Sequence, residues 1–286
     1  MNNQKRNNKV AIGFLTCTPH IELIRFANEI SSTTNELDVY IIIDDNTYDP
    51  PQSDCSLHFI QVDNNQCVSN GYRNSLTLIW EKECLAWDKA LYYFCRLNGK
   101  TYDFVWLVEE DVFIPSVHGL IVLNGQCCSQ GYDLVCQRNH YNLHGALESL
   151  TWRFWFDAKD KFPLPWYHSM ICAVGLSRRL LIKTDEYVTA RCFLPFIEYF
   201  FNTIAMHEQL HVYCPPELST INYRHDWILK EIRQSPMNWY HPIKDMKRQQ
   251  QLRERLLNSS DVDDDDNEPE QKEYEPDCFC LQLPNI

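Results

Sequence analysis

The sequence predicts an α/β protein built on an open sheet that is wrapped by helices. Three short apolar segments, 10–17, 38–43 and 104–108, have the length and the unbroken hydrophobicity of strands buried on both faces. Helical patterns fall between them, over 20–31 and 83–97. An alternation of strands and helices is typical of a parallel sheet covered by helices.

The elements that connect these segments are predicted from local signals. The 83–97 pattern places Trp87 and Leu91 on one apolar face, and an Asn-Gly pair closes it as glycine commonly closes helices. A shorter strand is predicted over 57–62. The Asn- and Ser-rich segment 63–75 is predicted to be a loop.

After Pro115 the pattern is less regular. We predict strands over 133–138 and 169–176, separated by an aromatic loop over 152–166. Helices are predicted over 196–209 and 246–257.

Composition predicts one globular domain with two extensions. With 286 residues, 44% of them hydrophobic, the chain can bury a substantial core. We predict a flexible leader over 1–8, a domain over 9–257 and an acidic, disordered tail over 258–286. Ten acidic residues and one lysine lie in 259–286, so the net charge of −13 leaves only −4 for the rest of the chain. A mildly acidic body argues against a nucleic-acid partner, which needs a clustered basic face.

The sequence predicts a cytoplasmic protein with reduced thiols. Its thirteen cysteines are scattered, and no pairs repeat at zinc-site spacing. No signal peptide is recognised, and no apolar run reaches the length of a membrane span. A fragment of a longer, membrane-anchored protein of the Golgi or ER lumen would show the same sequence features.

Acidic residues directly follow two of the predicted strands. Asp44 and Asp45 end the 38–43 strand, and Glu109, Glu110 and Asp111 follow the 104–108 strand. Ligands of open α/β sheets bind at the carboxyl ends of strands. Mg²⁺ and Mn²⁺ prefer hard oxygen ligands and accept phosphate oxygens as well. We therefore predict a site for Mn²⁺ or Mg²⁺ at this edge of the sheet.

The run 87–115 resembles the donor-binding half of GT-A glycosyltransferases, which use nucleoside-diphosphate sugars. Glu110-Asp111 matches the family's x-E-D variant of the D-x-D motif, and Glu109-x-Asp111 matches the looser acid-x-acid form. The resemblance implies a GT-A, Rossmann-like open mixed sheet with metal ligands at Glu109 and Asp111. It also implies donor contacts from Glu110 and from Lys89, which lies in the same run.

The likeness extends to segments on both sides of this run. Thr16, Asp44 and Asp45 stand where the family holds the nucleoside, and Arg73 lies in a segment that resembles its nucleotide loop. Residues 239–244 resemble a C-terminal His-Pro-x-Lys motif, which implies His241 as a third metal ligand. His225 is a competing candidate.

Transfer to an acceptor hydroxyl, on a glycan or a glycoprotein, needs a general base. Glu198 is an acid within an otherwise apolar helix pattern, and we predict it as that base; Asp185 and Glu186 are weaker alternatives. Tryptophans of the 152–166 loop are candidates for stacking on an acceptor sugar.

Two alternative functions remain open. A sugar nucleotidyltransferase would share the sheet and the metal acids, although the glycine-rich basic loop expected after its first strand is missing. A non-catalytic protein that keeps the GT-A scaffold would share the fold alone. A dinucleotide oxidoreductase is disfavoured because no Gly-x-Gly-x-x-Gly follows the first strand.

Overall fold

The computed structural model describes residues 9–51, 57–98, 102–147 and 152–258. The predicted leader and all but the first residue of the predicted acidic tail lie outside this part of the chain. No helix among the described residues has the length and apolar character needed to cross a bilayer.

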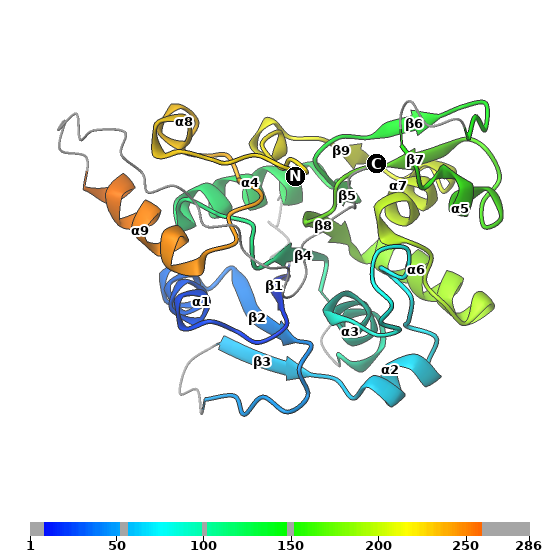
Figure 1. The fold of residues 1–286 in the computed structure, drawn as a ribbon, viewed down its shortest axis with the longest axis horizontal. Coiled ribbons are helices and arrows are strands. Elements are labelled where there is room, and N and C mark those ends of the chain that lie inside the picture. The colour runs from blue at the N-terminus through cyan, green and yellow to red at the C-terminus, as the bar shows by residue number, and fades with distance from the viewer. Residues whose placement is uncertain (1–8, 52–56, 99–101, 148–151, 259–286) are drawn as a thin grey trace, which may run out of the picture.

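A seven-stranded sheet forms the centre of the molecule, in the order β3-β2-β1-β4-β8-β5-β9 (Figure 1). The first four strands are parallel, and β8 runs antiparallel to both of its neighbours, β4 and β5. The predicted fold class, an open mixed α/β sheet flanked by helices, is confirmed. The strands are β1 (Val10–Thr16), β2 (Leu37–Ile43), β3 (Leu57–Gln61), β4 (Phe104–Glu109), β5 (Leu134–Val135), β8 (Ala173–Ser177) and β9 (Val212–Tyr213).

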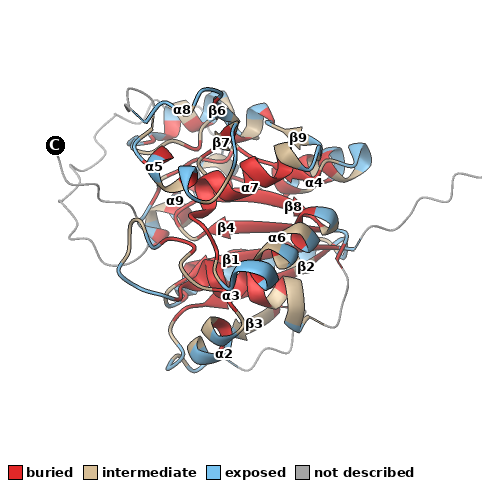
Figure 2. Ribbon diagram, turned by 90° about the vertical axis from the view of Figure 1, so that its right-hand side faces the viewer, coloured by how far each residue is buried: buried red, intermediate tan, exposed pale blue. Residues whose placement is uncertain are grey.

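Helices cover both faces of this sheet and bury its central strands (Figures 1 and 2). Every residue of β1 and β4 is buried, which explains their unbroken apolar runs. One face packs against the first helix and two later ones: α1 (Ile21–Thr33), α4 (Val117–Gln130) and α9 (Met246–Leu257). The other face packs against α3 (Ala86–Tyr92), its π-helical continuation (Tyr93–Leu97), α6 (Arg178–Arg191) and α7 (Ile197–His207).

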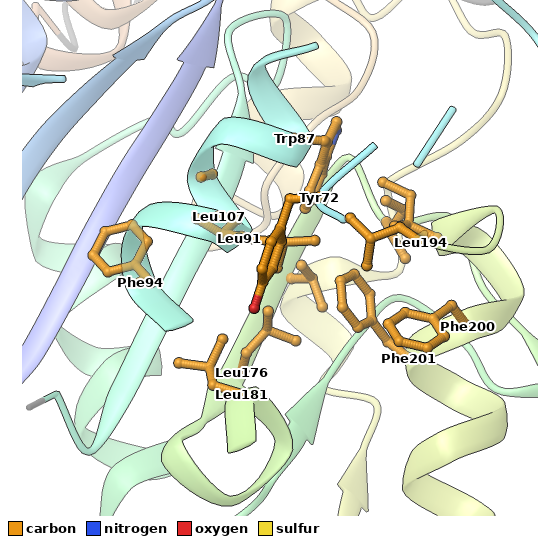
Figure 3. Packing of buried hydrophobic residues seen from close by; sticks show 14 of the residues in the cluster. Tyr72, Trp87, Leu91, Phe94, Leu107, Leu176, Leu181, Leu194, Phe200 and Phe201 are labelled. Atoms are coloured by element: carbon orange, nitrogen blue, oxygen red, sulfur yellow. The ribbon is translucent and has the colours of Figure 1, made fainter. Parts of the chain in front are cut away.

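The second of these cores is largely aromatic and leucine-rich. Figure 3 shows Trp87 and Leu91 of α3 facing Leu107 of β4 and Phe200 and Phe201 of α7. The core therefore fixes α3 and α7 on either side of the end of β4, where the acidic triplet lies.

Smaller elements complete the molecule (Figure 1). A two-stranded antiparallel sheet, β6 (His140–Asn142) with β7 (Trp166–His168), packs against α7. The remaining helical segments are α2 (Asn64–Ser69), α5 (Trp155–Lys159), a 3₁₀ turn (Pro216–Leu218) and α8 (Leu229–Gln234).

Several local predictions were wrong. The predicted loop over 63–75 contains α2, because Asp63 caps the backbone N–H of Gln66. The predicted strand over 133–138 contributes only Leu134–Val135 to the sheet. The aromatic loop over 152–166 contains α5.

Helices α4 and α6 were not predicted, although both begin at a capping serine. Ser116 accepts a hydrogen bond from Gly119 N, and Ser177 accepts one from Leu180 N. Helix α4 ends at Gly131 with φ of 67°, the usual left-handed stop.

Candidate metal and donor site

The three acids after β4 point to three different partners. Glu109 accepts a hydrogen bond from Trp87 Nε1 at 2.7 Å, and Glu110 accepts one from Thr16 Oγ1 at the end of β1. Asp111 Oδ2 lies 3.3 Å from His241 Nε2. Since β1 and β4 are adjacent parallel strands, their carboxyl ends bring Thr16 and the triplet together.

His241 is held in place by the backbone on both sides. Tyr240 pairs with Phe113 just beyond the triplet, and Ile243 N donates to the carbonyl oxygen of Asp111 at 2.8 Å. The ring atom Nδ1 lies 2.6 Å from the carbonyl oxygen of Asn222. An Nδ1–H donated to a carbonyl leaves Nε2 facing Asp111, which is the arrangement that orients metal-binding histidines.

Two further buried groups line the same place, one of them predicted and one missed. Glu198, in the first turn of α7, is 7% exposed. Cys172, just before β8, was not predicted; one ligand atom each from Glu109, Cys172 and His241 lie within 4.8 Å of one another. Nothing in the sequence distinguishes Cys172 from the other scattered cysteines. Burial, and next the carboxylates of Glu109 and Asp111, raise the pKa of Cys172, so the sulfur remains a protonated thiol.

The site carries an excess of buried carboxyl groups. Burial, and next the charge of Asp111, raise the pKa of Glu109 to about 7. Burial, and next the charge of Glu109, raise the pKa of Glu198 to about 8. Burial alone would lower the pKa of His241, but the charge of Asp111, the charge of Glu109 and the hydrogen bonds of the ring with Asp111 and the Asn222 backbone together outweigh it, and the pKa is raised.

These residues fit a divalent cation. The nearby charge of His241 lowers the pKa of both Glu109 and Glu198, against the effect of burial. Two ligands about 2.1 Å from one ion, in a tetrahedral or octahedral shell, are about 3.0 to 3.4 Å apart. The 3.3 Å between Asp111 Oδ2 and His241 Nε2 falls in that range.

A separate cluster of charged side chains lies at the end of β2. The carboxylate of Asp44 is fully buried, 2.5 Å from Lys82 Nζ and 3.4 Å from Lys89 Nζ. Lys89 is also fully buried and donates to Asp44 O at 2.5 Å and to Asn46 Oδ1 at 2.7 Å. Lys89 thus supports the turn after β2, and direct donor contacts by Lys89 and Asp44 stay a prediction.

Asp45 remains accessible at that turn. Its carboxylate accepts hydrogen bonds from Thr47 N at 2.8 Å and Thr47 Oγ1 at 2.7 Å, and these bonds lower its pKa. The turn thus fixes the Asp45 carboxylate at the edge where a donor would bind.

Arg73 lies in the connection between α2 and α3 and is already engaged. It pairs with Glu83 at 2.8 Å and donates to Cys192 O at 3.2 Å. A contact between Arg73 and a bound diphosphate would have to replace this half-exposed pair.

The remaining candidates have other surroundings. His225 pairs with Glu231 and is partly exposed. Asp185 of α6 pairs at 2.5 Å with Arg96, which lies in the π-helical continuation of α3. The tryptophans Trp155 and Trp166 are 2% and 3% exposed, so they belong to the core and cannot stack on an acceptor.

Comparisons with known proteins find likeness only among solved structures. No protein-family model matches the chain, and no curated protein matches it. Similar solved structures include the galactosyltransferase LgtC in complex with donor and acceptor sugar analogs, at 13% identity and a TM-score of 0.41. The match covers 88% of this chain and 98% of that one. Both values are too low to transfer a substrate or a ligand from LgtC.

Proposed function

We propose that the protein is a glycosyltransferase that moves a sugar from a nucleoside-diphosphate sugar to an acceptor hydroxyl, with Mn²⁺ or Mg²⁺ as cofactor. The observation that carries the proposal is the meeting of Asp111 and His241, 130 positions apart, at the carboxyl end of β4. Their 3.3 Å separation lies among buried carboxyl groups.

Asp111 and His241 would hold the cation, with Glu109 beside them. A cation at this place would offset the negative charge that develops on a departing nucleoside diphosphate. Glu109 accepts a hydrogen bond from Trp87, so its carboxylate is already oriented before any ligand arrives.

The donor side is formed by the ends of β1, β2 and β4. Asp45 presents an accessible carboxylate, which suits hydrogen bonds from ribose hydroxyls. Thr16 and Glu110 are bonded to each other at the boundary between this side and the cation position. Glu110 would therefore act together with Thr16, by fixing the ends of β1 and β4 relative to each other.

The acceptor side is formed by the start of α7. We assign Glu198 as the base: its carboxylate would take the proton of the acceptor hydroxyl as that oxygen attacks the sugar. Close to this helix start, the Trp152 ring stacks on His168 with ring centroids 4.1 Å apart. The acceptor would be a glycan or glycoprotein hydroxyl.

A nucleotide-binding series tests the proposal. Thermal unfolding would be followed with UDP, GDP and CMP, each with and without Mn²⁺, for the wild type, Asp111→Ala, His241→Ala and His225→Ala. We expect one nucleotide to raise the Tm only with Mn²⁺ present. The rise should disappear in Asp111→Ala and His241→Ala and persist in His225→Ala, the matched control outside the site.

Two results would contradict the proposal. Absence of any nucleotide effect at millimolar nucleotide and Mn²⁺ would favour a non-catalytic scaffold. Binding of a nucleoside triphosphate with pyrophosphate release in the presence of a sugar phosphate would favour a nucleotidyltransferase.

A further inference from the structure

Two cysteines face each other across the last two strands of the sheet, away from the candidate metal site. Strands β5 and β9 pair in parallel, with Leu134 beside Val212 and Val135 beside Tyr213. The next pair in this register is Cys136 and Cys214, and Cys136 N donates to Tyr213 O at 3.1 Å. The two Sγ atoms are 3.9 Å apart, and both residues are free thiols.

The backbone already meets the requirements of a disulfide. Neighbouring strands lie about 4.8 Å apart, within the range of about 4.4 to 6.8 Å for Cα atoms joined by a disulfide. The sulfurs would need to approach by about 2 Å, which side-chain rotation can supply. No strand has to shift.

The two thiols differ in access and in reactivity. Cys214 is exposed, whereas Cys136 is buried. The hydrogen bond from Cys136, opposed by burial but helped by the backbone N–H of Asn139, lowers the pKa of Cys214 to about 7. Because the thiolate is the nucleophile, Cys214 is the residue that attacks and Cys136 the one that resolves.

We propose that Cys136 and Cys214 form a reversible disulfide by exchange with a small-molecule disulfide such as oxidised glutathione. The Cys214 sulfur attacks one glutathione sulfur, the glutathione S–S bond breaks, and one glutathione leaves as its thiol. Cys136 then attacks the Cys214 sulfur of the mixed disulfide, and the second glutathione leaves. Two thiol protons and two electrons pass from the protein to glutathione.

The disulfide between Cys136 and Cys214 would lie beside α7. Asn202 Nδ2 donates to Cys136 Sγ at 3.5 Å and to Asn139 Oδ1 at 3.0 Å, and Ser169 Oγ donates to Asn202 Oδ1 at 2.9 Å. Asn202 stands one turn after Glu198 on the same helix. The cross-link would therefore tie the sheet edge together close to the helix that carries Glu198, whatever the protein's activity.

Peptide mapping tests this proposal without reference to activity. The folded full-length chain would be incubated with excess oxidised glutathione, the remaining thiols alkylated, and the peptides identified by mass spectrometry with and without prior reduction. We expect a peptide pair joined through Cys136 and Cys214 that reduction separates.

Three variants sharpen the result. Cys136→Ser should accumulate glutathione on Cys214, since nothing resolves the mixed disulfide, and Cys214→Ser should leave Cys136 unmodified. Cys192→Ser, which removes another exposed thiol, should form the cross-link as the wild type does. The proposal is overturned if wild-type Cys214 stays reduced, or if it ends as a stable glutathione adduct while Cys136 stays free.

Discussion

The parallel strands β1 to β4 and the segments from α4 to α9 build the candidate site in different ways. The first region supplies the acids at the ends of β2 and β4, strands of six or seven residues that are buried apart from the half-buried Asp38. The second supplies His241 and Glu198 from a loop and a helix start, in a region whose strands have two to five residues. Long buried strands place residues by their own regularity, whereas the second region places them through capping, hydrogen bonds and docking onto the first.

This difference explains how far the sequence could predict the molecule. Strands β1, β2 and β4 were predicted within a residue or two because parallel strands buried on both faces are continuously apolar. Helices α4 and α6 were missed because their signals are caps rather than strong amphipathic periodicity.

The candidate site, like the fold, was predictable from the sequence only in part. The acids at strand ends follow from topology alone, and His241 came only from a motif resemblance. The hydrogen bond from Trp87 to Glu109 and the position of Cys172 beside Glu109 depend on side-chain packing between distant segments, which no local pattern encodes. The burial of Lys89 inside an ion cluster is likewise a tertiary property, which the sequence does not show.

The largest expected effect compares one glycine from each region. A Cβ at Gly175 of β8 would lie 2.5 Å from a ring atom of Phe104, whereas one at Gly13 of β1 would meet the flexible end of Ile42 at 2.7 Å. The Phe104 ring is also held edge-to-face against Trp106. We expect Gly175→Ala to lower the free energy of unfolding by about 3 kcal/mol and Gly13→Ala by about 1 kcal/mol.

Urea unfolding of the two variants measures this difference. Equal losses of unfolding free energy would mean that the packing around β1 and around β8, the two neighbours of β4, accommodates an added methyl group equally well. Gly125→Ala in α4 is the control, because its added Cβ meets nothing within 4 Å and should stabilise the helix slightly.

A single glutamine links the two regions at the site. Gln249 of α9 is 1% exposed and donates through Nε2 to Glu110 O at 2.9 Å and to Ile243 O at 2.9 Å. Gln249→Leu leaves both carbonyls without this donor, so we expect a loss of about 2 to 3 kcal/mol in unfolding free energy.

The same variant should also weaken Mn²⁺-dependent nucleotide binding, because the His241 segment loses one of its supports. Gln250→Leu, whose side chain only reaches Glu254 in the next turn, is the matched control and should behave as the wild type. A fully stable Gln249→Leu would show that the regions are joined by other contacts.

In the second region, a pH effect on stability is expected at His168. Burial lowers the pKa of His168 to about 3, so between pH 3 and its usual value near 6.5 the unfolded chain binds a proton that the folded one does not. Stability is therefore lost as pH falls below about 6.5, and at pH 5 the loss is about 2 kcal/mol.

His168→Phe keeps an aromatic ring beside Trp152 and removes this titration. Urea unfolding at pH 8 and pH 5 should show a smaller decrease for the variant, by about 2 kcal/mol. Parallel pH profiles for wild type and variant would refute the assignment to His168.

The smallest expected effect is at Arg73 in the first region. Its pair with Glu83 is solvent-exposed on both sides, so Glu83→Gln should change the unfolding free energy by no more than about 0.5 kcal/mol. If Arg73 contacts a donor diphosphate, freeing it from Glu83 should leave nucleotide affinity equal or tighter. Weaker binding in Glu83→Gln would mean that the pair itself orients the nucleotide loop.

The central claim is that the end of β4 and the His241 segment form one cation site. Electron paramagnetic resonance of free Mn²⁺, in the presence of the nucleotide that stabilises the protein, measures it directly. We expect one Mn²⁺ bound per wild-type chain, loss of that binding in both Asp111→Ala and His241→Ala, and retention in His225→Ala. Unchanged Mn²⁺ binding in folded His241→Ala, or no binding by the wild type, would contradict the account.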